Sequence, residues 1–256
     1  NITHEFRTPL TVILGLSHDM QKDSSHAKNC AGLELQICDS VDKIDFLINV
    51  PVLKGHCQTK MTCALKNLKG LIPNKEKRHF HAMGLHKPIA HLNMGIHQDF
   101  VVVDHICGDL DFEDGGNPTV CNCVMTAVDP VLMDTCACHM LHYETRDIDY
   151  LVFAEELGCG STDLEHANIQ MCSRNIGYKE PELPKSYKVA ALEDAVEEVE
   201  SCSACYGYFL PALQRLKEEG FLEKLDTKVC IGQGYRGKHG RLGVGSCTSG
   251  FEYSVK

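Results

Sequence analysis

The sequence predicts an α/β protein, with a layered, mainly parallel sheet and flanking helices. A smaller Cys-rich region follows the sheet, and a short N-terminal helix precedes it. Between about Leu33 and Cys172, short apolar runs typical of buried strands alternate with segments of helical periodicity. After this segment, a C-x-x-C pair and several glycine-rich stretches mark a region of different character.

The composition is that of a globular protein, with 43% hydrophobic and 23% charged residues. The formal net charge of -10 argues against a nucleic-acid partner, because such a partner favours a basic face. No apolar run approaches the ~20 residues of a membrane-spanning helix. The chain contains 15 cysteines. Cytosolic proteins keep their thiols reduced, and a cysteine-rich cytosolic chain commonly does metal or redox work. We expect this protein to be cytoplasmic and of that kind.

The first residues differ from the rest of the chain. The stretch THEFRTPL at residues 3–10, with the TVILGL after it, resembles the phosphoacceptor box of sensor histidine kinases (about Asn1–His26). The resemblance implies that His4 accepts a phosphoryl group, and an imidazole is a nucleophile near neutral pH. The sequence contains no ATP-binding motifs of such a kinase. We therefore expect residues 1–32 to be a kinase-like fragment. It would be joined to the rest of the chain either at a junction between two unrelated fragments or as a decayed natural fusion.

A strand and a polar cluster come next. Leu33–Val50 is predicted to form a strand, a turn and a buried strand that ends before Pro51. A helix from about Thr59 to Leu68 would place its apolar residues on one face. The polar residues after the strand are Lys54, His56, Lys60, Lys66, Asn67 and Lys69. Open α/β sheets bind ligands at such strand ends, so the cluster predicts a site for a small anionic ligand. The alternative is a solvated basic helix.

The middle of the chain adds carboxylates. Ile72–Leu92 is predicted to be mostly a His-rich loop, followed by a helix over Ile89–Ile96. Phe100–Ile106 is predicted to be a buried strand that carries Asp104. A third strand, Asn122–Val128, ends at Asp129, which suits a helix N-cap. Alternatively, Asp129 shares a site with the lysines, for proton transfer or for metal-bridged phosphate. The candidate catalytic residues are therefore Lys54, His56, Lys66, Asn67, Asp104 and Asp129. Asp147–Leu157 is predicted to be an amphipathic helix that ends at Gly158.

A segment rich in Lys, Glu and Pro, residues 175–188, is predicted to be a linker. It separates an α/β domain, residues 33–174, from a Cys-rich region, residues 189–256. Ala190–Glu200 is predicted to be an acidic helix, and Tyr208–Glu219 another helix.

The Cys-rich region carries a predicted metal site. Cys202 and Cys205 form a C-x-x-C pair just before a helix, whose dipole favours thiolates. Cys230 and Cys247 lie amid glycines, which allow a backbone to wrap an iron–sulfur cluster. The alternatives are a structural zinc ion and a redox-active C-x-x-C pair.

Several stretches resemble the family called domain of unknown function 362, over about Leu33–Lys256. They are VPVLKGHCQTKMTCALKNLKGLIP, HKPIAHLN, VVVDHICGDLDFEDGGNPT, DPVLMD and YLVFAEELGCGSTDLEHANI. The family has no settled activity, but many members carry or adjoin iron–sulfur ligand motifs. The resemblance also implies a cysteine beyond Lys256 that would complete a four-iron cluster with Cys202, Cys205 and Cys247.

These observations predict an iron–sulfur-containing redox or electron-transfer domain, or a small-molecule enzyme. Its partner would be an electron-transfer protein or a small anionic ligand. Two alternatives remain: a phosphorelay protein with His4 as phosphoacceptor, and a zinc-stabilised, non-catalytic binding module.

Overall fold

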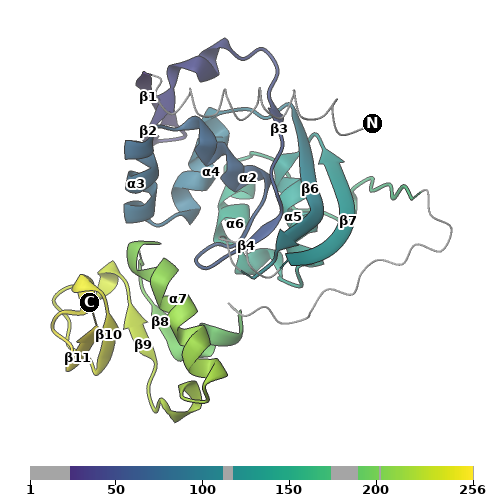
Figure 1. Cartoon of the computed structure of the whole chain (residues 1–256). Coiled ribbons are helices and arrows are strands. Elements are labelled where there is room, and N and C mark those ends of the chain that lie inside the picture. Colours follow the sequence, from purple (N-terminus) through teal and green to yellow (C-terminus); the bar gives the residue numbers. More distant parts are fainter. Residues whose placement is uncertain (1–23, 112–117, 174–189, 202, 256) are drawn as a thin grey trace, which may run out of the picture.

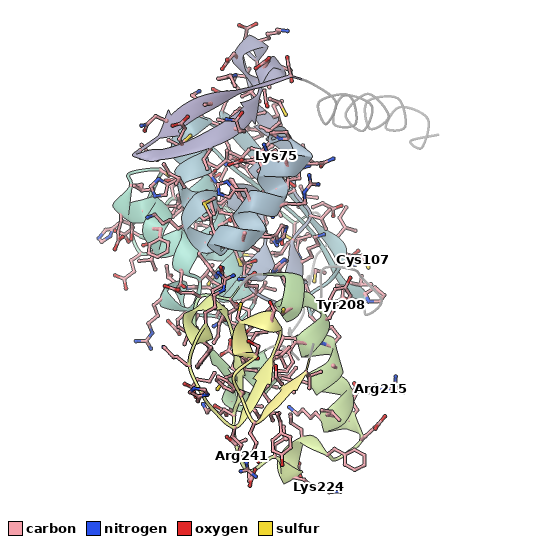
Figure 2. All side chains as sticks on the ribbon, turned by 90° about the vertical axis from the view of Figure 1, so that its left-hand side faces the viewer. Lys75, Cys107, Tyr208, Arg215, Lys224 and Arg241 are labelled. Carbon is pink, nitrogen blue, oxygen red and sulfur yellow. The ribbon has the colours of Figure 1, made fainter. Side chains whose placement is uncertain are left out.

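The computed structural model describes residues 24–111, 118–173, 190–201 and 203–255. They form a larger body (residues 24–173) and a smaller body (residues 190–255) at one end of it (Figures 1 and 2). The predicted N-terminal helix, the linker 175–188 and Cys202 lie outside the described residues.

The larger body contains β1 (Ser25–Cys30), β2 (Leu33–Cys38), β3 (Ile48–Asn49), β4 (Lys54–His56), β5 (Lys60–Thr62), α2 (Ala64–Asn67), α3 (Asn74–Met83), α4 (His86–Gly95), β6 (Phe100–Asp109), β7 (Pro118–Ala127), α5 (Pro130–Met140) and α6 (Asp149–Glu156). The smaller body contains β8 (Val196–Glu198), α7 (Ser203–Glu218), β9 (Val229–Ile231), β10 (Leu242–Val244) and β11 (Tyr253–Val255). The mixture of helices and strands, with parallel pairing, confirms an α/β class.

The three-stranded sheet of the larger body is not mainly parallel. Its strand order is β3-β6-β7; β3 pairs parallel with β6, but the two long strands β6 and β7 are antiparallel. The chain between them, residues 110–117, is too short for a parallel crossover, which needs about a dozen residues or more. The acidic, glycine-rich stretch therefore joins neighbouring strands. The prediction treated the strands as separated by helices and missed this hairpin.

A parallel sheet is instead found in the smaller body, with the order β11-β10-β9-β8 and every pair parallel. After β9 and β10 the chain turns at Gly232 and Gly245, which both have positive φ, and then enters a 3-10 turn. The predicted acidic helix Ala190–Glu200 is wrong. The segment forms a 3-10 turn and then β8, because Val196 is buried beside Val229 of β9.

Two helix predictions also need correction. The helix expected from about Thr59 begins only at Ala64, because Lys60 adopts a positive φ of 63° and its segment pairs with β4 as a hairpin. The stretch predicted as a His-rich loop forms α3 and the start of α4, whereas the helix predicted over Ile89–Ile96 is confirmed as the later part of α4. In α3, Phe80 is the one buried apolar residue of the helix and the other residues are mostly charged or histidine, so the sequence shows no apolar stripe at helical spacing.

The two bodies meet through the β4–β5 hairpin and the end of α3. Gln58 Nε2 donates to the Ser201 carbonyl at 3.0 Å. Gln233 Nε2 donates to the Ala82 carbonyl at 2.6 Å. Cys57, at the hairpin turn, packs against the apolar core of the smaller body. The hairpin that carries Lys54 and His56 is therefore also the contact between the bodies.

Gly55 is a position at which this hairpin admits no side chain. A Cβ atom there would lie 2.5 Å from the Leu110 carbonyl oxygen and 2.6 Å from that of Asp111. We expect Gly55→Ala to lower the free energy of unfolding by about 1–3 kcal/mol, because backbone must move to accommodate the methyl group. Chemical denaturation measures this change. Gly70→Ala is the matched control, since nothing lies within 4 Å of its Cβ position; equal losses in both variants would contradict the prediction.

Candidate functional site at the β4–β5 hairpin and helix α2

Helix α2 begins on a buried carboxylate. Asp134, from α5, accepts a hydrogen bond from Ala64 N at 2.7 Å and one from Leu65 N at 3.1 Å. The Asp134 side chain is fully buried, and burial raises the pKa of its carboxyl group to about 7. The donors that hold α2 therefore face a carboxyl group that changes charge near neutral pH.

Two further titratable groups surround Asp134. Burial, with the nearby Asp134 charge, raises the pKa of Cys63 and of Tyr150 well above their usual values, so both stay neutral. The Tyr150 hydroxyl is close enough to affect the pKa of Asp134 but lacks the geometry of a hydrogen bond. His86 stacks on the Tyr150 ring at 5.9 Å, and its Nδ1 accepts from Tyr150 N.

Thr62 lies next to two lysines at this site. Lys66, on α2, is only 4% exposed, and its Nζ donates to Thr62 Oγ1 at 2.9 Å. Thr62 is the cross-strand partner of Lys54 in the β4–β5 hairpin, and side chains of such a pair lie on the same face. A buried ammonium group is costly unless polar groups surround it. The arrangement thus places Lys66 in contact with the Thr62 hydroxyl and Lys54 on the same face of the hairpin as Thr62.

A chain of carboxamides fixes α2 from its other side. Asn67 Nδ2 donates to Asn49 Oδ1 at 2.6 Å, and Asn49 Nδ2 donates to the Ala64 carbonyl at 2.8 Å. Gln98 accepts from Asn49, and its own Nε2 donates to Asn93 Oδ1 at 2.6 Å. Asn93 Nδ2 then donates to the Leu65 carbonyl at 2.9 Å. The network ties α2 to β3 and α4.

His56 holds the turn of the hairpin. Its Nδ1 accepts hydrogen bonds from Gln58 N at 3.1 Å and Thr59 N at 3.0 Å, and the ring is 3% exposed. An Nδ1 that accepts from two backbone N–H groups carries no proton, so the ring is neutral. His56 therefore contributes to the shape of the site.

The two predicted aspartates lie apart from α2. Asp104 is on the β6 face that points away from the core, and its Oδ1 accepts from Ile106 N at 2.9 Å. Asp129 is the N-cap of α5, as its N-cap interpretation predicted, and accepts from Val131 N and Leu132 N. Its other oxygen accepts from Ser161 N at 2.9 Å. The structure thus groups Lys54, His56, Lys66 and Asn67, and places both aspartates elsewhere; their catalytic role stays a prediction.

Asp134 is the residue that sequence reasoning did not select. The signal was present, since Asp134 lies within the apolar stretch PVLMDTCAC at helical spacing from the buried residues Pro130, Val131 and Cys138. A carboxylate on the buried face of a helix requires a donor from another element.

A pocket of about 180 Å³ adjoins the carboxamide network. Asn93 and Gln98 line one side of it, and Asp129 and Cys159 the other. Its volume is below the roughly 300 Å³ at which drug-sized ligand pockets begin. It could therefore admit only a small ion or molecule.

Of the predicted ligand cysteines that the structure describes, Cys205 lies near the turn that carries Cys247, and Cys230 lies apart from them. Cys205 Sγ lies 2.6 Å from the position of a Cβ on Gly245, two residues before Cys247. Cys230 is on the other face of β9, because its neighbours Val229 and Ile231 pack toward α7 in the apolar core. Within the part of the chain that the structure describes, no three His, Cys, Asp or Glu side chains could hold a metal ion. Cys202 lies outside that part, so the predicted ligand set stays a prediction.

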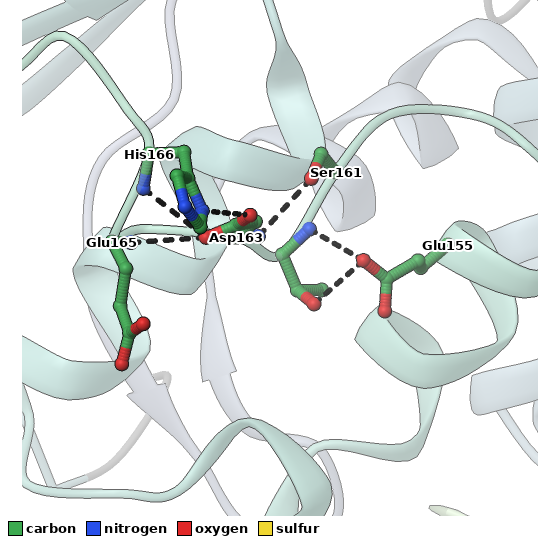
Figure 3. Close-up of polar contacts among 6 residues, drawn as sticks. Glu155, Ser161, Asp163, Glu165 and His166 are labelled. Atoms are coloured by element: carbon green, nitrogen blue, oxygen red, sulfur yellow. Dashed lines mark hydrogen bonds and ion pairs between the residues drawn. The ribbon is translucent and has the colours of Figure 1, made fainter.

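A second polar group lies in the loop after α6 (Figure 3). His166 Nδ1 is 2.6 Å from Asp163 Oδ2, and Glu155 accepts from Thr162 N and Oγ1 at 2.7 Å. Hydrogen bonds from His166 hold the pKa of Asp163 below its usual value. These side chains are exposed and order the loop.

Asp134 gives the protein a distinctive pH dependence. Because its pKa is higher in the folded protein than the usual 3.8, the folded state binds more protons between pH 3.8 and about 7. This group therefore stabilises the fold at low pH, and its contribution falls by up to about 1.4 kcal/mol per pH unit as pH rises through that range. We expect Asp134→Asn to remove this fall, as measured by urea denaturation from pH 5 to 8.

The matched control for this measurement is Asp163→Asn. Asp163 is exposed and has a lowered pKa, so it is ionised in both folded and unfolded chains above pH 5. Its variant should keep the wild-type slope. A slope in Asp134→Asn equal to that of the wild type would show that Asp134 does not titrate in this range.

Comparisons with known proteins give one match. The family model described as "Domain of unknown function (DUF362)" matches residues 6–139, which is just over half of the 256 residues. No curated protein and no solved structure matches.

The match spans the hairpin, α2 and Asp134, and stops before the Cys-rich region. It also includes most of the N-terminal segment that resembles a phosphoacceptor box; nothing in the comparisons supports that second resemblance. His4 lies outside both the match and the described residues, so its role stays a prediction. Among the helices described, none is long and apolar enough to cross a membrane. The chain belongs to the family described as Domain of unknown function (DUF362).

Proposed function

We propose that the protein binds a small anionic ligand, such as a phosphate or a carboxylate, at the site formed by the β4–β5 hairpin and α2. The observation that carries this proposal is the contact of the buried Lys66 ammonium group with the Thr62 hydroxyl, beside Lys54, the cross-strand partner of Thr62. Two ammonium groups and a hydroxyl are a suitable donor set for an oxyanion. The net charge of -10 makes such a paired cationic site unusual on this chain.

The buried position of Lys66 favours selective binding. A charge in a low-dielectric surrounding interacts with an anion more strongly than an exposed lysine does. The Asp134 contacts and the carboxamide network hold α2, and therefore Lys66, in one position. Asp134 acts here as a positioning residue, because it contacts the helix backbone.

Lys66→Met tests this site, because methionine keeps most of the length of the side chain and removes the charge. We expect the affinity for inorganic phosphate, measured by isothermal titration calorimetry, to fall at least tenfold. Lys69→Met is the control: Lys69 follows α2, and its Nζ lies 3.3 Å from His81 Nε2. The proposal would be refuted if Lys66→Met bound phosphate as tightly as the wild type. It would also be refuted if the wild type bound neither phosphates nor carboxylates.

We further propose a thiolate-bound iron–sulfur cluster in the smaller body, which would give the protein a redox function with an electron-transfer partner. The position of Cys205 against the Gly245–Cys247 turn supports it. Cys202, Cys205 and Cys247 are the residues that would hold the cluster, and the cluster would supply one-electron transfer. Zinc is the alternative for the same thiolates, in a non-catalytic binding module.

The cysteine variants separate these possibilities. After anaerobic reconstitution with iron and sulfide, we expect Cys205→Ser to lose bound iron and visible absorption. Cys230→Ser should retain both, because Cys230 faces the other side of β9. Cys107→Ser, at an exposed position of the larger body, is the second control (Figure 2). A colourless wild type with bound zinc would establish the zinc alternative, and full iron retention in Cys205→Ser would refute both.

A further inference from the structure

One face of the three-stranded sheet has no helix over it within the described residues. The inner face carries Val101 and Val103, which are fully buried against the core, and α5 contacts both β6 and β7. The helices of the larger body gather on this inner side (Figure 1). The opposite face, here called the outer sheet face, consists of the even-numbered residues of the segment 46–52, of β6 as far as Ile106 and of residues 124–128, because the register of β6 and β7 shifts between His105 and Cys107.

Side chains on the outer sheet face form rows across the three strands. Ile48 pairs with Phe100, and Val52 pairs with Asp104. Asp104 pairs in turn with Val124 of β7. Residues paired in this way lie on the same side of the sheet. The face is therefore one continuous surface.

In an antiparallel sheet with one face in water, that face normally carries polar side chains. The outer sheet face is apolar instead. Its large exposed residues, with their exposed fractions, are Phe46 (61%), Ile48 (54%), Val50 (46%), Val52 (42%), Ile106 (48%), Val124 (56%) and Val128 (72%). The run Phe46–Val50, which the sequence predicted as a buried strand, is thus an edge segment in which only Asn49 is buried.

The area of the face is that of a protein–protein interface. With roughly 150–200 Å² for a fully exposed large side chain, these residues together present on the order of 700 Å². A single apolar patch on a monomer is commonly about 300–600 Å². A standard stable complex buries ~800 Å² on each partner.

The charge distribution indicates which partner fits. The chain carries a net charge of -10, so most of its surface repels a second copy. The rows described above contain one charged residue, Asp104, whose Oδ1 already accepts from Ile106 N. An uncharged apolar face is self-complementary, as a two-fold interface between identical chains requires.

We infer that the outer sheet face is the contact surface of a homodimer, in which the same face of a second copy of this chain covers it. The contact removes valine and isoleucine side chains of both copies from water, which is the driving force for association. In this dimer, helix α2 of each copy lies away from the interface, because α2 is on the inner side of the sheet.

Sedimentation equilibrium of the full chain tests this inference. We expect a mass of twice 28.4 kDa at micromolar concentration. Val124→Glu places a charge in the row of Val52 and Asp104 in each copy and should weaken dimerisation at least 100-fold. Thr126→Glu, at an exposed polar position on the same face, should do the same without removing an apolar side chain. Tyr208→Glu is the control, because Tyr208 is 85% exposed on α7 (Figure 2).

Two results would overturn the inference. One is a wild type that is still monomeric at about 100 µM, roughly a hundredfold above a micromolar dissociation constant. In that case another occupant, such as residues 1–23, covers the face. The other is a dimer that Val124→Glu and Thr126→Glu leave as tight as the Tyr208→Glu control does.

Discussion

Two backbone hydrogen bonds to one buried carboxylate position the candidate site. Helix α2 comprises only Ala64–Asn67, and a helix this short does not persist by its own backbone hydrogen bonds. Asp134 accepts from its first two N–H groups, which have no acceptor within the helix. Since Lys66 and Asn67 are on this helix, their positions depend on a residue of α5 that is distant in sequence.

The carboxamide network complements this contact from the opposite end. Asn49, Asn67, Asn93 and Gln98 donate to one another and to the carbonyl groups of α2. Buried amides are tolerated when their partners are present and costly when one is removed. The helix is therefore held at its N–H groups by a carboxylate and at its carbonyl groups by amides. This arrangement matches the polarity of a helix at both ends.

The sequence predicted the features that depend on local chemistry. The long strand at Phe100, the N-cap Asp129 and the helix ended by Gly158 have residue types that favour these structures on their own. Lys66 and Asn67 were found because they lie within one distinctive stretch. The sheet direction, helix α3 of the His-rich segment and the role of Asp134 were missed. Each of them depends on which distant element packs nearby, and a single sequence does not contain that information directly.

The parallel strands of the smaller body have a consequence for how that body opens. Strands β9, β10 and β11 are stacked as successive rungs, and each rung pairs only with its immediate neighbours. In such a stack, stability is a sum of rung and neighbour terms, so opening can proceed stepwise from an end. Strand β11 has one neighbour and an exposed Val255, whereas β9 has two neighbours and packs on α7. Protection against amide exchange should therefore decline from β9 toward β11, and Cys247 lies on the last turn before the rung that opens first.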